Sequence, residues 1–538
     1  MSADEQKVIA VSTKPNNPSG LGNSHPKGAM TNAGWNAFFT LWSIAVSFLL
    51  SPVLIHHLGT AQYGILLLIW SITGILGIAS FGLGEATLRY VAYHYGDGDL
   101  SGVNRVFGST LSVYAAVCAA IAAVLFVAAP TVAAFLKIPA NEHHLVGWLL
   151  RLSAVVFSLG IFSRAFGAIP MALQRYDISS KINIGSSVVR SVGYILLVVS
   201  NFGILHLVIW DIVTGVCLIA VQVVVIRKLS PGVRLLPSFT FRGLREIVGY
   251  SVYSLLTYVF YTMFRESGKL VLGRYLGPSP VAFLGTPDNV AQRVHMLVAS
   301  SSETLLPRIS ANRDPKTAQA LFLGSTWGAL AFSIVLFIPM VVLMPDFLRL
   351  WINPQFSVES AAVGQLLALS YISQGAFAPA AAHFRGIGMP WVVTIVLFLA
   401  GVCTLLAGIL LVPAHGVLGA GYAYLIGSFA HLLGLLCGWF YIFGRSSVAS
   451  LMRAIVLPLT LAAVAFVLEN AIRVGVHEVN WIGLFMLGGL FAGMTALLVL
   501  GADWIIGGDS PSRRLCDRIG ESERFRQLAR YLPAWKAR

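Results

Sequence analysis

The chain has 538 residues, of which 57% are hydrophobic and only 11% are charged, and its mean hydropathy is +0.79. Soluble domains carry about 25% charged residues, so this composition excludes an ordinary water-soluble enzyme. The formal net charge of +14 could indicate nucleic acid. The positions of the cations, given below, explain the charge in another way, so no nucleic-acid partner is predicted.

About fourteen apolar blocks of roughly twenty residues follow one another from Asn36 to Ile506. A bilayer core about 30 Å thick needs about twenty apolar residues per helix, and only helices or closed barrels can cross it. The blocks lack strand-like alternation, so we predict an all-α polytopic membrane protein. The expected spans are 36–58, 64–88, 106–129, 146–169, 182–201, 204–226, 250–276, 282–306, 321–344, 360–382, 390–412, 416–442, 454–470 and 480–506.

The distribution of cations predicts the orientation. Residues 1–35 are polar and lack the apolar segment of a signal peptide, so a disordered cytosolic tail is expected. With this end inside, about 26 Lys and Arg residues fall in cytosolic segments. Only five fall outside: Lys137, Arg151, Arg274, Arg349 and Arg473. The positive-inside rule then places both termini in the cytosol.

The basic linker 227–249 divides the first twelve spans into six plus six. Residues 53–59 (VLIHHLG) match residues 271–277 (VLGRYLG) at four of seven positions, at an offset of 218 residues. An even number of helices separates the copies, so both run in the same direction. We therefore predict two six-helix bundles, 36–226 and 250–442, around a central cavity, with helices 13 and 14 (443–506) as an addition.

In the C-terminal segment, residues 507–538, six arginines from Arg513 to Arg530 lie among regularly spaced apolar residues. A basic amphipathic helix lying on anionic membrane lipids of the cytosolic leaflet is one interpretation. A solvated basic tail is the other.

Several stretches of the chain resemble a known family. Residues 52–64 (PVLIHHLGTAQYG) and 82–90 (GLGEATLRY) are similar to the first hairpin of oligosaccharide flippases, the polysaccharide transporter branch of the MATE/MOP superfamily. The matching stretch at 271–277, residues 303–308 (ETLLPR) further along, and residues 384–390 (FRGIGMP) fit the same family. The resemblance covers roughly residues 31–445. Many relatives carry an acid just before the Gly-Leu-Gly, where this chain has Ser80 and Phe81, so no coupling role carries over to that position.

The resemblance implies two bundles in a V that alternates between inward-open and outward-open states. The implied function is to move a polyprenyl-pyrophosphate-linked oligosaccharide from the cytosolic to the periplasmic leaflet of the bacterial inner membrane, for O-antigen, capsule or exopolysaccharide assembly. Glycosyltransferases and a polysaccharide polymerase are the protein partners that such a role implies. The chain has no P-loop motif and no clustered metal ligands, so we expect no cofactor, no metal and, for energy, an H⁺ or Na⁺ gradient.

Three alternatives remain open. A MATE-like drug or cation exporter would need an acidic cavity, whereas the deep charges here lean positive. A lipid II flippase also carries an anionic cargo, but relatives of that type would be expected to have cations in the first span, and this chain has none between Asn36 and Leu58. A membrane glycan polymerase or ligase would be an enzyme with catalytic residues on a sizeable outer loop, and the longest one here is only residues 345–359.

Charges inside the spans indicate where cargo could bind, because each costs about 2.5–3.5 kcal/mol on insertion scales. Arg265 and Lys269 share a helix face, and Glu266 could neutralise Lys269. Arg binds phosphate through paired hydrogen bonds and Lys as a point charge. Arg265, Lys269 and Arg293 are therefore the candidates for the cargo pyrophosphate, with a surplus cation on a cavity face. Snorkelling of the first two to the outer interface and a buried pair between the bundles remain alternatives.

Six further charges are coupling or gate candidates: Glu85, Arg89, Asp211, Glu266, Asp288 and Glu303. The repeat pairs Glu85 with Glu303 near the cytosolic ends of their helices, where ion pairs with Arg89 and Arg308 are expected at a gate or as plain interfacial salt bridges.

The remaining charged residues of the spans have simpler expected roles. Asp288 could cap a helix that begins after Pro287. Asp211 is expected nearer the outside, and Arg164 and Arg190 are expected to anchor helices at the cytosolic interface.

Overall fold

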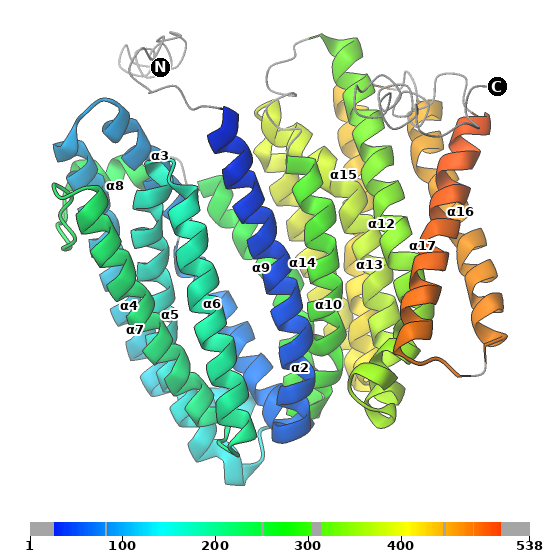
Figure 1. Cartoon of the computed structure of the whole chain (residues 1–538), viewed down its shortest axis with the longest axis horizontal. Helices are drawn as coiled ribbons and strands as arrows, with labels where there is room; N and C mark the ends of the chain where they lie inside the picture. Colours follow the sequence, from blue (N-terminus) through cyan, green and yellow to red (C-terminus); the bar gives the residue numbers. More distant parts are fainter. Residues whose placement is uncertain are drawn as a thin grey trace.

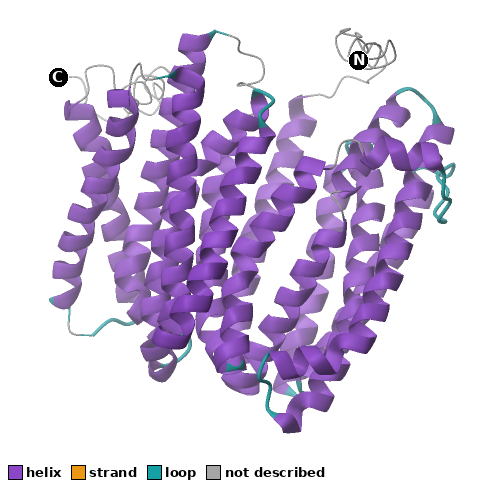
Figure 2. Cartoon of the chain, turned by 180° about the vertical axis from the view of Figure 1, so that it is seen from behind, coloured by secondary structure: helices purple, strands orange, loops and turns teal. Residues whose placement is uncertain are grey.

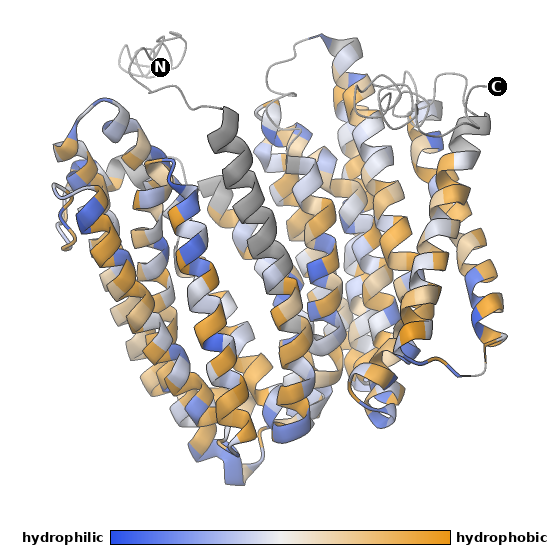
Figure 3. Cartoon of the chain, viewed as in Figure 1, coloured by the Kyte–Doolittle hydropathy of each residue, from blue (hydrophilic) through white to orange (hydrophobic). Residues whose placement is uncertain are grey.

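The computed structural model describes residues 26–80, 83–248, 252–303, 314–444, 448–476 and 478–506. All regular secondary structure in these ranges is helical, and most helices stand side by side along one direction (Figures 1 and 2). Apolar residues dominate α4, α7, α16 and α17 (Figure 3), and many of them are exposed, as lipid-facing helices require. The predicted all-α polytopic architecture is confirmed.

The first half of the chain forms α2 (Pro26–Leu76), η1 (Gly77–Ser80), α3 (Leu83–Gly96), α4 (Leu100–Phe135), η2 (Ala140–Glu142), α5 (His143–Ala172), α6 (Tyr176–Val199) and α7 (Ile204–Leu229). After the short α8 (Phe241–Val248) come α9 (Val252–Leu276), α10 (Pro278–Glu303), α12 (Pro315–Trp351), α13 (Pro354–Gly386), α14 (Pro390–His415), α15 (Val417–Phe443), α16 (Val448–Val474) and α17 (Trp481–Ile506).

Every predicted span coincides with a helix in the described part of the chain, once α2 is divided at its kink and η1 and α3 are joined to the second arm. By length and composition, 10 helical segments could cross a membrane. The more polar α9, α10 and α13 stand among them in the bundles (Figure 1). Several helices extend beyond their predicted spans, such as α4 by six residues at each end, and α2 begins at Pro26, ten residues before its apolar span. Pro suits the first turn of a helix, and a helix can extend into water past the bilayer.

The two halves share a backbone feature at the position where their sequences match. Gly59 kinks α2 with φ 75°, and Gly277 separates α9 from α10 with φ 81°. Positive φ is readily adopted only by glycine, so each half needs this residue to turn its first helix into its second. The match between VLIHHLG and VLGRYLG therefore marks the same turn in both halves.

The hydrophobic core is continuous at one end of the molecule and divided at the other. At the end remote from the first turn of α2, Leu68 and Leu136 of the first half pack in one core with Leu272 of the second. At the other end, the core around Phe107 belongs to the first half alone, and the core around Trp439 to the second alone. The bundles thus form a V that opens toward the end holding the first turn of α2 and the last turn of α17 (Figure 1).

The linker after α7 is folded onto the first bundle. Asn104 at the start of α4 accepts a hydrogen bond from the Arg234 amide at 2.7 Å and donates one to the Gly232 carbonyl at 3.1 Å. The Ser238 amide donates to the Gly108 carbonyl at 3.1 Å. These contacts attach the first part of the linker, from Gly232 to Ser238, to α4. The interpretation of residues 507–538 lies outside the described residues.

Helices α16 and α17 stand outside the two bundles, against α12 (Figure 1), as predicted for the additional pair. An ion pair between Arg473 and Asp346 joins the end of α16 to α12. Arg349 donates a hydrogen bond of 2.8 Å to the Val479 carbonyl before α17. The pair is thereby held away from the space between the bundles.

Candidate functional site

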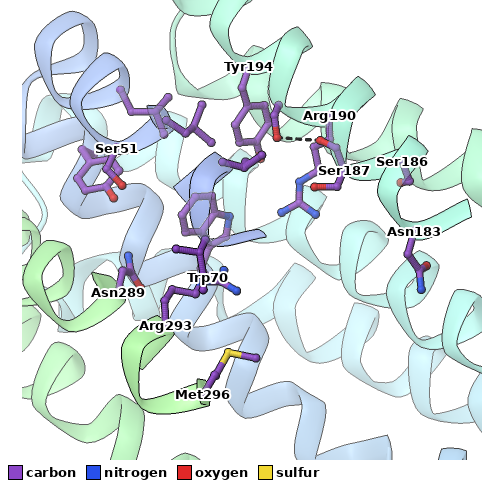
Figure 4. A pocket seen from close by; sticks show the side chains of 16 residues that line it. Ser51, Trp70, Asn183, Ser186, Ser187, Arg190, Tyr194, Asn289, Arg293 and Met296 are labelled. Carbon is purple, nitrogen blue, oxygen red and sulfur yellow. Dashed lines mark hydrogen bonds between the residues drawn. The ribbon is translucent and has the colours of Figure 1, made fainter. Parts of the chain in front are cut away.

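A cavity of about 560 Å³ lies between the two bundles, and α2, α6 and α10 supply its walls (Figure 4). Its polar lining comes from both halves of the chain: Ser51, Tyr63, Trp70, Asn183, Ser186, Ser187, Arg190, Ser191, Tyr194, Asn289 and Arg293. Among the described residues, the lining includes two guanidinium groups and no carboxylate. The volume is in the range of small-molecule sites, so this cavity is the candidate site.

Arg293 on α10 lies where the sequence placed a cargo-facing cation. It lines the cavity, is half-buried and has no ion-pair or hydrogen-bond partner among the described residues. A guanidinium with five donors that is partly removed from water and unpaired is costly unless water or a ligand accepts those bonds. Arg293 is therefore available to an anion.

Arg190 on α6 is the second cavity cation, and it is already paired. Its Nε lies 3.1 Å from Oδ1 of Asp211 on α7, while the Tyr194 hydroxyl donates to Oδ2 of the same carboxylate at 2.7 Å. The Asp211 side chain is 6% exposed, but that of Arg190 is 53% exposed and faces the cavity. The expectation that Arg190 anchors an interface was wrong, because its partner lies inside the bundle. Asp211 is the buried counter-ion of Arg190.

The other two predicted cargo cations lie in a compact ion cluster inside the second bundle. Lys269 Nζ is 3.1 Å from Glu266 and 3.5 Å from Asp288, and Arg265 is 3.7 Å from Asp288. The Tyr371 hydroxyl donates to Asp288 at 2.8 Å. The two cations and two carboxylates balance, with side chains 4–14% exposed.

This arrangement corrects part of the expectation for α9 and α10. The repeat correctly placed Arg265 and Lys269 inside a helix, and burial of Lys269 excludes snorkelling. The expected surplus cation is not found in this cluster, and neither residue lines the large cavity. Asp288 does not cap a helix, because α10 runs unbroken from Pro278 through Pro287.

The predicted gate residues are only partly described. Glu85 and Arg89 are both exposed on α3, and Arg89 has an interaction partner. No ion pair of Glu85 is found among the described residues. The side chain of Glu303 and all of Arg308 lie outside the described residues, so the expected pairing at this gate stays a prediction.

Sequence reasoning missed the polar face of α6. Asn183, Ser186 and Ser187 precede Arg190 at spacings of three and four residues, which places them on one side of a helix, and all four line the cavity. This period was visible in the sequence. Trp70, on the second arm of α2, belongs to no comparable pattern in the sequence.

Comparison with known proteins identifies the family. Residues 53–353 match the model of the family described as "Polysaccharide biosynthesis protein". None of the curated proteins matches the chain.

Three solved structures share the fold. The inward closed conformation of the lipid II flippase MurJ is 13% identical with a TM-score of 0.68, covering 86% of this chain and 97% of that one. An inward-facing multidrug resistance MATE family transporter of the MOP superfamily is 16% identical with a TM-score of 0.64, covering 76% and 96%. A MOP superfamily transporter from Pyrococcus furiosus, described as having a binding pocket of reverse polarity that suggests a different function, is 14% identical with a TM-score of 0.54, covering 77% and 94%.

These likenesses show the fold, and the family model covers more than half of the chain. The chain belongs to the polysaccharide biosynthesis protein family, as a multi-pass membrane protein with the fold of the MOP-superfamily transporters and flippases rather than that of an enzyme.

Proposed function

We propose that this protein is a flippase that moves a polyprenyl-diphosphate-linked oligosaccharide across the membrane for surface polysaccharide assembly. The observation that carries the proposal is the position of Arg293. Its guanidinium has no partner among the described residues and lies on the wall of the cavity between the two bundles. An Arg fork donates two parallel hydrogen bonds to a phosphate. Because Arg190 faces the same cavity from the other bundle, a diphosphate could bridge the two walls.

The charge of the cavity favours an anionic cargo over an organic cation. Its described lining holds no carboxylate, and the nearby acid Asp211 is occupied by Arg190. A cation exporter would have to place its positive cargo beside Arg293, at a cost of several kcal/mol in a site of low dielectric constant. The Pyrococcus furiosus transporter offers a parallel, since a reversed pocket polarity is what suggests its different function within the superfamily.

The V-shaped core supports an alternating mechanism. The headgroup would enter from the open end, where each bundle has a separate core, while the lipid tail stays in the bilayer. Release on the other side requires the continuous core around Leu68 and Leu272 to part. With both termini in the cytosol of a bacterial inner membrane, this direction is export. An H⁺ or Na⁺ gradient would supply the energy, and protonation of Asp211 would free Arg190 for cargo.

The lipid II flippase MurJ structure makes lipid II a second candidate cargo. Both cargoes present a diphosphate to Arg293, so the saccharide distinguishes them. A flippase for surface polysaccharide should move a polyprenyl-diphosphate-linked oligosaccharide faster than lipid II.

The experiment is a flipping assay in proteoliposomes, with a fluorescent polyprenyl-diphosphate-linked oligosaccharide and a reagent that detects it only in the outer leaflet. We expect Arg293→Ala to lower the rate by at least tenfold, since it removes a charge-assisted contact worth about 1.5–3 kcal/mol. Arg151→Ala is the matched control, because that arginine stacks on Phe126 and Trp148 of the first bundle, away from the cavity. Equal rates for wild type, Arg293→Ala and empty liposomes would refute the proposal.

A further inference from the structure

We infer that the face of α6 beside Arg190, together with Trp70, is a saccharide subsite that reads the uncharged sugar next to the diphosphate. The inference rests on the proposed function and assigns a role to residues that the phosphate does not need. Figure 4 shows Asn183, Ser186 and Ser187 following one another along α6 toward Arg190, with Trp70 beside Arg293 across from this wall.

The hydrogen-bonding groups of this face are unused. Neither the Asn183 amide nor the Ser186 and Ser187 hydroxyls has a partner among the described residues, although all three line the cavity. Ser191 on the same helix differs, because its hydroxyl donates to the Ser187 carbonyl at 2.7 Å. An amide and a hydroxyl each offer both donors and acceptors, which is the pattern that sugar hydroxyls complement.

The absence of charge on this face defines the class of sugar. Between Asn183 and Ser187 the described cavity lining carries no ionisable side chain, and its cations lie at Arg190 and Arg293. An acidic sugar placed between Asn183 and Ser187 would have no cation beside its carboxylate. A neutral hexose or N-acetylhexosamine exchanges hydrogen bonds to water for hydrogen bonds to the wall.

Trp70 supplies the apolar part of the subsite. The indole belongs to the second arm of α2, is partly buried and lines the cavity, and its N–H has no partner among the described residues. A sugar ring has C–H groups on its faces and hydroxyls at its edge, so it can pack on an aromatic face. The hydroxyls at the edge of the stacked sugar are then free to bond to the polar groups of α6.

The order of residues along α6 gives the orientation of the cargo. Asn183 lies seven residues before Arg190, about 10 Å along the helix axis, on the side of the open end. A diphosphate held at Arg190 and Arg293 would therefore place its first sugar beside Ser186 and Ser187. Later sugars would extend toward the opening, where each bundle has its own core. The subsite thus selects the first sugar rather than the length of the glycan.

The test compares the binding of two lipids to the purified protein in nanodiscs. One is a short polyprenyl diphosphate, and the other is the same lipid carrying one N-acetylglucosamine. We expect wild type to bind the glycolipid at least about tenfold more tightly, which corresponds to a few new hydrogen bonds. The double variant Ser186→Ala/Ser187→Ala and the variant Trp70→Leu should each reduce this ratio to below about threefold.

The matched control is Ser158→Ala on α5, whose hydroxyl donates to the Ala154 carbonyl and which does not line the cavity. Its ratio should equal that of wild type. A wild-type ratio near one, or a tenfold ratio retained in both the serine and the tryptophan variants, would overturn the subsite while leaving diphosphate binding intact. If the bare diphosphate lipid fails to bind, or binds equally to Arg293→Ala, the proposed function itself fails and the subsite with it.

Discussion

Gly64 lies at the closed end of the cavity, where the two halves of the chain touch backbone to backbone. A Cβ on Gly64 would lie 2.0 Å from the carbonyl oxygen of Pro278 and 2.6 Å from its carbonyl carbon. Carbon atoms in contact are normally about 3.5–4.0 Å apart, and no side-chain rotation can move a backbone carbonyl. Gly64→Ala therefore forces α2 and the start of α10 apart by about 1 Å.

The expected cost is set by overpacking, which is typically about 1–3 kcal/mol. Because every 1.4 kcal/mol is a factor of ten, a penalty of about 2–3 kcal/mol shifts the equilibrium roughly 30–150-fold away from the state in which this end is closed. We expect Gly64→Ala to populate a state in which the closed end has parted and to slow cycling. Gly147→Ala on α5 is the control, because nothing lies within 4 Å of its added Cβ.

The assay is a spin-label distance measurement between the bundles at the closed end. Labels at Asn141 in η2 and Val358 in α13, both exposed, report the separation after the native cysteines are replaced. Gly64→Ala should add a longer distance that Gly147→Ala lacks. A distribution identical to wild type, together with unchanged thermal stability, would refute the assignment of this contact as the closed gate.

Three other variants probe the ion pairs. Lys269→Ala leaves two buried carboxylates with one cation, so we expect a loss of about 3–5 kcal/mol in stability. The melting temperature, measured by size-exclusion chromatography after heating, should fall. Asp211→Asn should cost at most about 1 kcal/mol, since Arg190 is more than half exposed, and should strengthen pyrophosphate binding measured by calorimetry; weaker binding would contradict this pairing. Arg473→Ala should free α16 from Asp346 and raise hydrogen exchange there, with no effect on pyrophosphate affinity.

Most of the architecture followed from periodic features of the sequence. Apolar blocks of bilayer length predicted each long helix, because the hydrocarbon core fixes the length of a span. The repeat at 53–59 and 271–277 predicted the two halves. Its final glycine recurs because the chain turns at Gly59 and Gly277 with positive φ. The start of α2 was missed, because outside the bilayer hydropathy no longer defines where a helix begins.

The site was less predictable, because pairing of charges across helices is not encoded in local spacing. Arg293 was placed in the cavity by its depth in the span alone. Asp288 lies nineteen residues beyond Lys269 in the sequence, yet the packing of α9 against α10 brings them within 3.5 Å and neutralises the cluster. Likewise, the partner of Arg190 became evident only when α6 and α7 were packed together.

The most direct measurement is a structure of the protein in nanodiscs with a polyprenyl-diphosphate-linked oligosaccharide bound. Our mechanism predicts the diphosphate between Arg293 and Arg190, with the first sugar against α6 and the lipid tail leaving the cavity for the bilayer. A diphosphate bound outside the cavity between α2, α6 and α10, with Arg293 making no contact to it, would contradict it.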